Sequence, residues 1–138
     1  MSEPDALVDT SVAVALVVGG HEAHQRTLEA LGDRRLGLAG HAWFETFSVL
    51  TRMPPPARRR PREVVAILEH DFPESRFLSE GATRDLIEAL TGAGVSGGAV
   101  YDALVGHTAA AHGLSLVTRD GRALDVYRAV GAAVETIA

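Results

Sequence analysis

Four acidic residues stand where a folded chain can bring carboxylates together. Asp9 follows the short apolar run "ALV", and Asp120 follows the apolar run "LSLVT" by two residues. Glu45 and Asp102 lie in the largely apolar stretches "HAWFETFSVL" and "AVYDALVGHTAAAHG". Two carboxylates 4 Å apart repel each other by ~4 kcal/mol at an effective dielectric constant near 20. If the four converge, they must therefore bind protons or hold a cation.

The cation that such a cluster favours is a hard one. Oxygen ligands suit Mg²⁺ or Mn²⁺ better than zinc or copper, and the chain has no cysteine to offer a thiolate. Each acid alone has a purely structural alternative. Asp9 suits a helix N-cap, Asp102 the first turn of a helix, Glu45 a solvated face and Asp120 a turn.

The elements that must position these acids alternate along the chain. Apolar runs and helical periodicity predict short strands at Ala6–Val8, Leu36–Ala39, Phe77–Leu78, Leu114–Thr118 and Ala133–Ile137. Helices are predicted at Ser11–Val18 (capped by the hydroxyls just before it), His21–Leu31, His41–Arg52, Arg62–Asp71, Thr83–Leu90, Ala99–His112 and Arg122–Val130. This order predicts an α/β fold with a parallel sheet covered by helices on both faces, in three layers. Ligands of such sheets bind beyond the carboxyl ends of the strands, which is where Asp9 and Asp120 are expected.

Composition narrows the class of protein. With 138 residues and no linker, we expect one domain over 1–138. The net charge of −5 argues against a protein that only coats nucleic acid. All 13 basic residues are arginines, so every activity that needs a catalytic or phosphate-binding lysine is excluded. The absence of cysteine and of a long apolar segment leads us to expect a cytoplasmic protein without a membrane anchor.

Four motifs together resemble one enzyme family. "LVDTSV", "FETFSVLTR", "GGAVYDALV" and "GLSLVTRD" occur in the order and at the spacing of the PIN-domain ribonucleases, and within them the chain resembles the VapC toxins of bacterial toxin–antitoxin pairs. The resemblance spans nearly the whole chain. It implies a compact α/β/α PIN domain with metal-dependent endoribonuclease activity, a homodimer and a cognate antitoxin. Its four acids fall on Asp9, Glu45, Asp102 and Asp120, and Ser11 matches the hydroxyl that follows the first acid.

The chemistry and the resemblance together suggest roles. Asp9 and Asp102 are expected to bind Mg²⁺ (or Mn²⁺) directly, Asp120 to support them or serve as a third ligand, and Glu45 to orient or deprotonate the attacking water. RNA is the expected substrate. The alternative function is a catalytically weak PIN-like module that binds RNA or a protein. A receiver domain is excluded because it needs a lysine, and a haloacid-dehalogenase-type phosphatase because Ser11 stands where its second acid would be.

An arginine cluster is the remaining feature of note. Arg58, Arg59 and Arg60 follow three prolines, with Arg52 and Arg62 nearby. Arginine suits bidentate contact with phosphate. The segment "RMPPPARRRPR" is therefore either a solvated loop, a contact for the RNA backbone or a dock for an acidic partner segment, and the sequence leaves these alternatives open.

Overall fold

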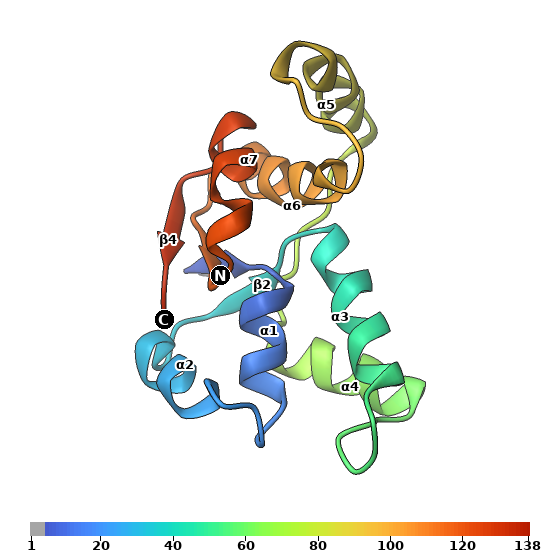
Figure 1. Ribbon diagram of the computed structural model, residues 1–138, viewed down its shortest axis with the longest axis vertical. Coiled ribbons are helices and arrows are strands. Elements are labelled where there is room, and N and C mark those ends of the chain that lie inside the picture. The colour runs from blue at the N-terminus through green and yellow to red at the C-terminus, as the bar shows by residue number, and fades with distance from the viewer. Residues whose placement is uncertain (1–4) are drawn as a thin grey trace.

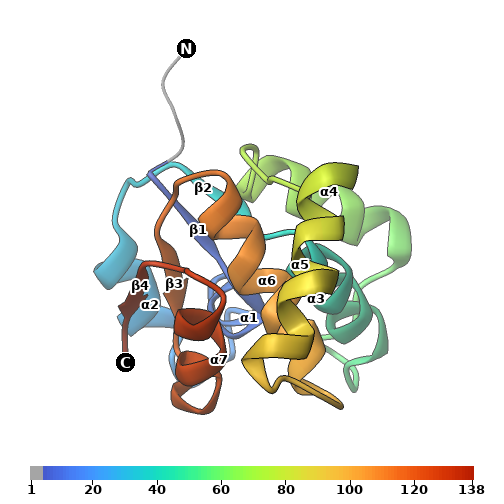
Figure 2. The ribbon, with the colours of Figure 1, turned by 90° about the horizontal axis from the view of Figure 1, so that it is seen from above.

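Four short parallel strands form the sheet at the centre of the molecule. The computed structural model describes residues 5–138. Strands β1 (Ala6–Val8), β2 (Leu36–Leu38), β3 (Leu116–Thr118) and β4 (Val134–Thr136) pair in the order β2-β1-β3-β4. Within β1, Leu7 lies opposite Gly37 on one side and Leu116 on the other. The predicted parallel α/β sheet is confirmed (Figures 1 and 2).

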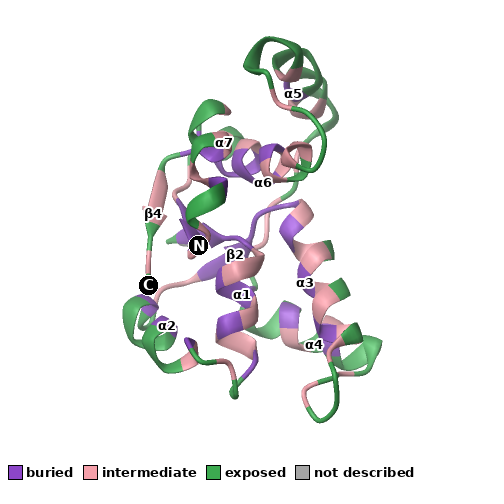
Figure 3. Cartoon of the chain, viewed as in Figure 1, coloured by how far each residue is buried: buried purple, intermediate pink, exposed green. Residues whose placement is uncertain are grey.

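Both faces of the sheet are covered. Successive residues of a strand point to opposite faces, and all three residues of β1, of β2 and of β3 are buried. Figure 3 shows these strands in the buried colour at the middle of the fold. The largest fully buried side chains include Leu7, Leu38, Leu50, Leu68 and Phe72. A run of continuous apolar residues suits a strand buried on both sides, which explains why these strands lack an apolar/polar alternation.

Seven α-helices and one 3₁₀ helix surround the sheet in the described part of the chain. They are α1 (Thr10–Val17), α2 (His24–Leu31), α3 (His41–Arg52), α4 (Pro61–Asp71), α5 (Glu80–Ala93), α6 (Ala99–Ala111), η1 (Gly121–Ala123) and α7 (Leu124–Ala129). Helix α5 extends away from the sheet at one end of the molecule, and the loop between α3 and α4 lies at the other (Figure 1). None of the helices in residues 5–138 is both long and apolar enough to span a bilayer.

The predicted strand at Phe77–Leu78 is wrong. The chain here runs beside β2, where Arg76 N–H donates to Leu38 O over 3.1 Å. Pairing is limited to one isolated parallel bridge between Ala39 and Arg76. The reason is that helix α3 begins at His41, so no extended partner remains beyond Ala39.

The predicted helices and strands also differ from the structure at their ends. The hydroxyls expected to cap the first helix do not do so, because the Asp9 carboxylate accepts the capping hydrogen bond from Val12 N–H. Helix α5 is longer than predicted and is capped by Ser79. The predicted helix 122–130 is divided into η1 and α7, because the Asp120 side chain caps a short 3₁₀ turn first.

The two edges of the sheet differ. Segment 74–76 covers the outer side of β2 so closely that a Cβ at Gly37 would lie 2.1 Å from the carbonyl oxygen of Glu74. Glycine is therefore required at that position. Strand β4 forms the opposite edge, where Val134 and Glu135 are partly buried and Thr136 is exposed.

Candidate active site

The four predicted acids line a single pocket. Asp9, Glu45, Asp102 and Asp120 surround a cavity of about 60 Å³ together with Thr10, Ser11, Val105 and Tyr127. They come from the residue after β1, from α3, from the first turn of α6 and from the loop after β3. A cavity of this size has room for an ion and a few water molecules but not for a nucleotide.

Asp9 is the most tightly held of the four. It is only 3% exposed, and its Oδ1 accepts hydrogen bonds from Ser11 Oγ at 2.6 Å and Val12 N–H at 3.2 Å. Its Oδ2 accepts from Thr118 Oγ1 at 2.5 Å and Tyr127 OH at 2.8 Å. A carboxylate has about four acceptor positions, so these donors satisfy the whole group. We call these donors the Asp9 cage.

The fold brings the members of the Asp9 cage together from distant parts of the chain. Strands β1 and β3 are neighbours, and Asp9 N–H donates to Val117 O at the end of their ladder. Thr118, the last residue of β3, therefore lies beside Asp9. Its hydroxyl also accepts from Asp120 N–H at 2.9 Å, so Thr118 connects the two acids that follow adjacent strands.

Tyr127 reaches Asp9 because helices α6 and α7 pack closely. Gly106 of α6 faces α7, and a Cβ at Gly106 would lie 2.9 Å from Val130 Cγ2 and 3.1 Å from Tyr127 Cα. Tyr127 is 3% exposed. Burial, the charge of Asp9 and the hydrogen bond to Asp9 raise the pKa of the Tyr127 phenol far above its usual range. The phenol therefore stays protonated and remains a donor.

The pKa values of Glu45 and Asp102 are both raised. Burial raises the pKa of Glu45, His41 partly opposes that shift, and Asp102 and Asp9 add to it. Burial also raises the pKa of Asp102, with further contributions from Asp120 and Asp9. Both carboxyl groups therefore hold their protons to a higher pH than an isolated carboxyl does.

One arginine lies beside this cluster in the structure. Arg122 Nε lies 3.7 Å from Asp120 Oδ1, and its charge lowers the pKa of Asp102. Because the Arg122 side chain is 97% exposed, water screens this pair strongly and its contribution is small. The repulsion among the four carboxylates is therefore only slightly relieved.

The donor set fits a hard divalent ion. Mg²⁺ is bound through one or two carboxylates and keeps several waters, which agrees with a pocket lined by carboxylate and hydroxyl oxygens. Within residues 5–138, no three acidic or histidine side chains form a ready set of metal ligands. Asp102 accepts no hydrogen bond from the described residues and is free to ligate, whereas Asp9 can do so only if a member of its cage gives up a hydrogen bond.

Two aromatic side chains border the acids. The rings of His41 and Tyr101 stack with centroids 4.9 Å apart and an interplanar angle of 23°. His41 Nε2 is 3.7 Å from Glu45 Oε1, and Tyr101 directly precedes Asp102 in α6. The pair thus connects α3 with α6 next to two of the four acids.

Sequence reasoning missed Thr118, Tyr127 and Arg122 as parts of this site. A buried carboxylate needs hydrogen-bond donors, and that requirement was the available signal. Spacing alone could not reveal which donors would meet it, because Tyr127 is 118 positions from Asp9.

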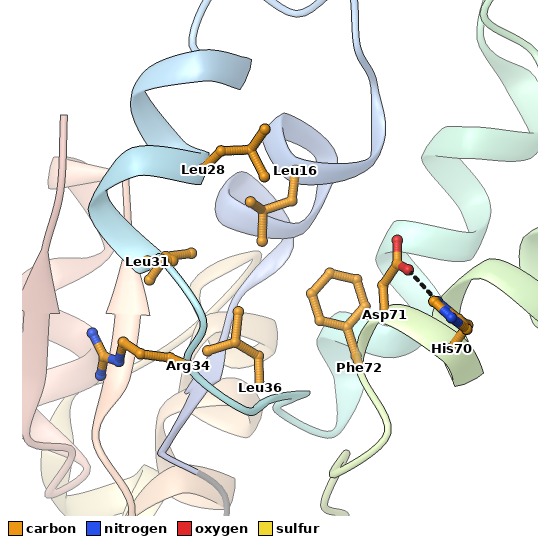
Figure 4. Close-up of a pocket in the computed structure, with 9 residues that line it drawn as sticks. Leu16, Leu28, Leu31, Arg34, Leu36, His70, Asp71 and Phe72 are labelled. Carbon is orange, nitrogen blue, oxygen red and sulfur yellow. Dashed lines mark hydrogen bonds and ion pairs between the residues drawn. The ribbon is translucent and has the colours of Figure 1, made fainter.

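A larger cavity lies elsewhere and lacks this chemistry. Its volume is about 380 Å³, and it is lined by the residues Leu16, Leu28, Leu31, Gly32, Arg34, Leu36, His70, Asp71 and Phe72. Its single carboxylate is Asp71, whose Oδ1 lies 2.8 Å from His70 Nδ1 (Figure 4). The cavity is mainly apolar and holds no carboxylate pair.

The predicted arginine cluster also lies away from the acids. It follows the C-terminal end of α3, whereas Glu45 lies in the N-terminal half of that helix. Arg58 Nε donates to Met53 O over 2.8 Å, and Arg59 donates to the carbonyl of Ala57 over 3.2 Å. These contacts order the loop around its prolines.

Comparisons with known proteins agree with the four motifs. A family model described as a PIN domain matches residues 6–129. Ribonuclease VapC27 of Mycobacterium tuberculosis is 43% identical over 129 residues, which cover 94% of both chains. Ribonuclease VapC40 of the same species is 46% identical over 131 residues, covering 94% of this chain and 96% of the relative.

A solved structure shares the fold. A chain in the crystal structure of VapBC2 from Rickettsia felis, bound to a DNA fragment from their promoter, superposes with a TM-score of 0.67 at 17% identity. The match covers 96% of this chain and 98% of that one.

Proposed function

The chain belongs to the PIN-domain family and to its VapC ribonucleases, and we propose that it is a divalent-metal-dependent endoribonuclease, the toxin of a toxin–antitoxin pair. The proposed reaction is hydrolysis of RNA phosphodiester bonds within the one PIN domain. An RNA substrate implies action in the cytoplasm.

One observation carries this proposal. Four carboxylates from four separate segments line a cavity of about 60 Å³ at the end of β1 and β3. Clustered carboxylates raise each other's pKa and reduce the stability of the fold. The cluster therefore calls for a functional explanation, and metal-assisted phosphodiester hydrolysis is a chemistry that needs only oxygen ligands.

Asp9 and Asp102 are the residues that we propose to hold Mg²⁺ or Mn²⁺. When bound, the ion supplies Lewis-acid polarisation of the scissile phosphate and stabilises the negative charge that develops there. One member of the Asp9 cage must give up its hydrogen bond to the ion, and the remaining donors then keep the carboxylate in place during the reaction. Asp120 is fixed through Thr118 and the η1 turn and supports the same site.

Glu45 is the proposed proton acceptor. A general base works best when its pKa lies near the working pH, and burial together with neighbouring carboxylates raises the pKa of Glu45 in that direction. His41, 3.7 Å from Glu45 Oε1, orients the carboxylate. Glu45 then removes a proton from the water that attacks the phosphorus.

The test is cleavage of total RNA by purified protein free of any partner, in Mg²⁺, in Mn²⁺ and in EDTA. We expect discrete fragments with either metal and none in EDTA. Asp102→Asn is the matched control, because the Asp102 side chain takes part in no hydrogen bond within the described residues, so we expect its replacement to leave the fold intact. Cleavage that persists in EDTA and in this variant would refute the proposal.

The second candidate function is the PIN-like module that binds RNA or a protein without cleaving. It is favoured by the observation that no three acidic or histidine side chains in residues 5–138 form a ready set of metal ligands. RNA binding without cleavage in either metal would favour this candidate.

The same preparation tests the partners that we propose, which are an antitoxin and a second copy of the chain. Copurification with the product of an adjacent gene would support an antitoxin, and the mass in solution would reveal a homodimer.

A further inference from the structure

Tyr101 is an aromatic side chain left in solvent beside the acidic pocket. It is 53% exposed, although His41 covers one face of its ring at a centroid separation of 4.9 Å. Burial therefore does not explain a tyrosine at this position. The ring is nevertheless held in place, because a stacked partner from α3 supports it.

The location of this pair relates it to the proposed reaction. Tyr101 and Asp102 are consecutive in α6, so their Cα atoms are about 3.8 Å apart. His41 lies one helical turn before Glu45 in α3 and approaches its carboxylate. The stack therefore lies against Glu45, one of the residues that line the pocket, so a nucleotide next to a phosphate in the pocket can reach the exposed ring of Tyr101.

The acidic pocket repels RNA, so the protein needs a source of RNA affinity that does not depend on charge. Four carboxylates repel the phosphates of RNA. The positive charge of Arg122 offsets this repulsion only weakly, because its side chain is almost fully exposed. Stacking on a base adds binding free energy that does not depend on charge and does not require a particular base. Single-stranded RNA presents such unstacked bases.

We propose that the Tyr101–His41 stack is a platform on which a base of single-stranded RNA lies, next to the phosphate that is cleaved. This inference rests on the proposed ribonuclease function and adds a contact that orients the substrate. Tyr101 supplies the free ring face, and His41 supports the ring from behind. The base thereby extends the stack.

The test compares two variants and two probes. Tyr101→Phe keeps the ring, whereas Tyr101→Leu keeps an apolar side chain without one. The probes are a fluorescein-labelled ten-nucleotide RNA of mixed sequence and an abasic strand of the same length. Dissociation constants are measured by fluorescence anisotropy in Ca²⁺, and gels of the same samples show whether the strand stays intact.

For the RNA with bases we expect Tyr101→Leu to bind about tenfold more weakly, whereas Tyr101→Phe stays within about twofold of the wild type. For the abasic strand we expect the wild type and Tyr101→Leu to bind equally. If Tyr101 had only a structural role, Tyr101→Leu would weaken the binding of both probes equally. Thermal unfolding of each variant verifies that the fold is unchanged.

Three outcomes would overturn the platform. Equal binding of the RNA by the wild type and Tyr101→Leu, with metal-dependent cleavage retained, would refute the platform and leave the ribonuclease function standing. A smaller mass in solution for Tyr101→Leu would assign the ring to an interface between two copies of the chain. A wild type that neither binds nor cleaves RNA would refute both proposals.

Discussion

The hydroxyl of Tyr127 donates a hydrogen bond to Oδ2 of Asp9 over 2.8 Å. The bond joins the residue that follows the first strand to a helix near the end of the chain. Both partners are buried, and the raised pKa of the phenol keeps Tyr127 a hydrogen-bond donor. The integrity of the pocket and that of the fold therefore depend on the same contact.

Tyr127→Phe should lower the free energy of unfolding by about 1.5–3 kcal/mol, because it removes a hydrogen bond to a buried charged group. Denaturation in urea measures this change. Tyr101→Phe removes the only other tyrosine hydroxyl of the chain, from an exposed side chain, and should leave the free energy of unfolding unchanged. Equal effects of the two substitutions would contradict the role assigned to Tyr127.

Asp9 and Asp102 should respond differently to replacement by the neutral amide. Asp102→Asn should match or slightly exceed the stability of the wild type at pH 7, because it removes a carboxyl whose pKa is raised on folding. It should reduce the cleavage rate at least about 100-fold, because several kcal/mol of charge stabilisation are lost. Asp9→Asn should lose cleavage and also about 1–3 kcal/mol of stability, since the amide offers one acceptor oxygen where the carboxylate offers two to its four donors. Isothermal titration with Mn²⁺ should detect weaker metal binding by folded Asp102→Asn, and binding at wild-type affinity would exclude Asp102 as a ligand.

Cleavage should increase with pH on the acidic side. Glu45 must be ionised to accept a proton, and its raised pKa places the ascending limb of the pH–rate profile above the pH at which an ordinary glutamate ionises. Because Asp102 and Glu45 influence each other, the limb reports on the group of carboxyls together. In Glu45→Gln the rate should fall and the remaining limb should shift. A profile identical in shape to that of the wild type would argue against Glu45 as the base.

The same pKa shifts reduce stability at neutral pH. A carboxyl whose pKa is higher in the folded than in the unfolded state binds more protons when folded, so stability falls as the pH rises between the two values. Glu45→Gln removes this loss and should raise the melting temperature at pH 7 by a few degrees at most, since the side chain is 41% exposed. At a pH below the ordinary pKa of glutamate the difference should vanish. A lower melting temperature for Glu45→Gln than for the wild type at pH 7 would contradict a destabilising charge on Glu45.

Gly106→Ala should misplace Tyr127. The new methyl group would meet Val130 Cγ2 and the backbone at Tyr127, which forces α7 away from α6 and costs about 1–2 kcal/mol. Thermal unfolding and RNA cleavage should both decline. Gly92→Ala is the control, because a Cβ at Gly92 has nothing within 4 Å and alanine favours a helix. A stable, active Gly106→Ala would show that the close helix contact is dispensable.

The sequence predicted the acids of the candidate site and missed what holds them. Parallel strands bring their carboxyl ends to one edge, so Asp9 and Asp120 could be placed together from local patterns alone. The partners of Asp9 could not, since Tyr127 becomes its neighbour only through the packing of α6 on α7. The error at Phe77–Leu78 has a similar origin, because whether an extended segment pairs depends on where its distant partner strand ends.

The two sheet edges have a consequence for self-association. Segment 74–76 occupies the outer side of β2, so another polypeptide cannot add a strand there. Within residues 5–138, β4 is the edge strand without a covering segment. It is three residues long and carries Glu135, whose carboxylate lies 2.8 Å from Arg34 Nη1. A short charged edge is a poor template for amyloid-like growth. Both edges of this small sheet therefore oppose edge-to-edge aggregation.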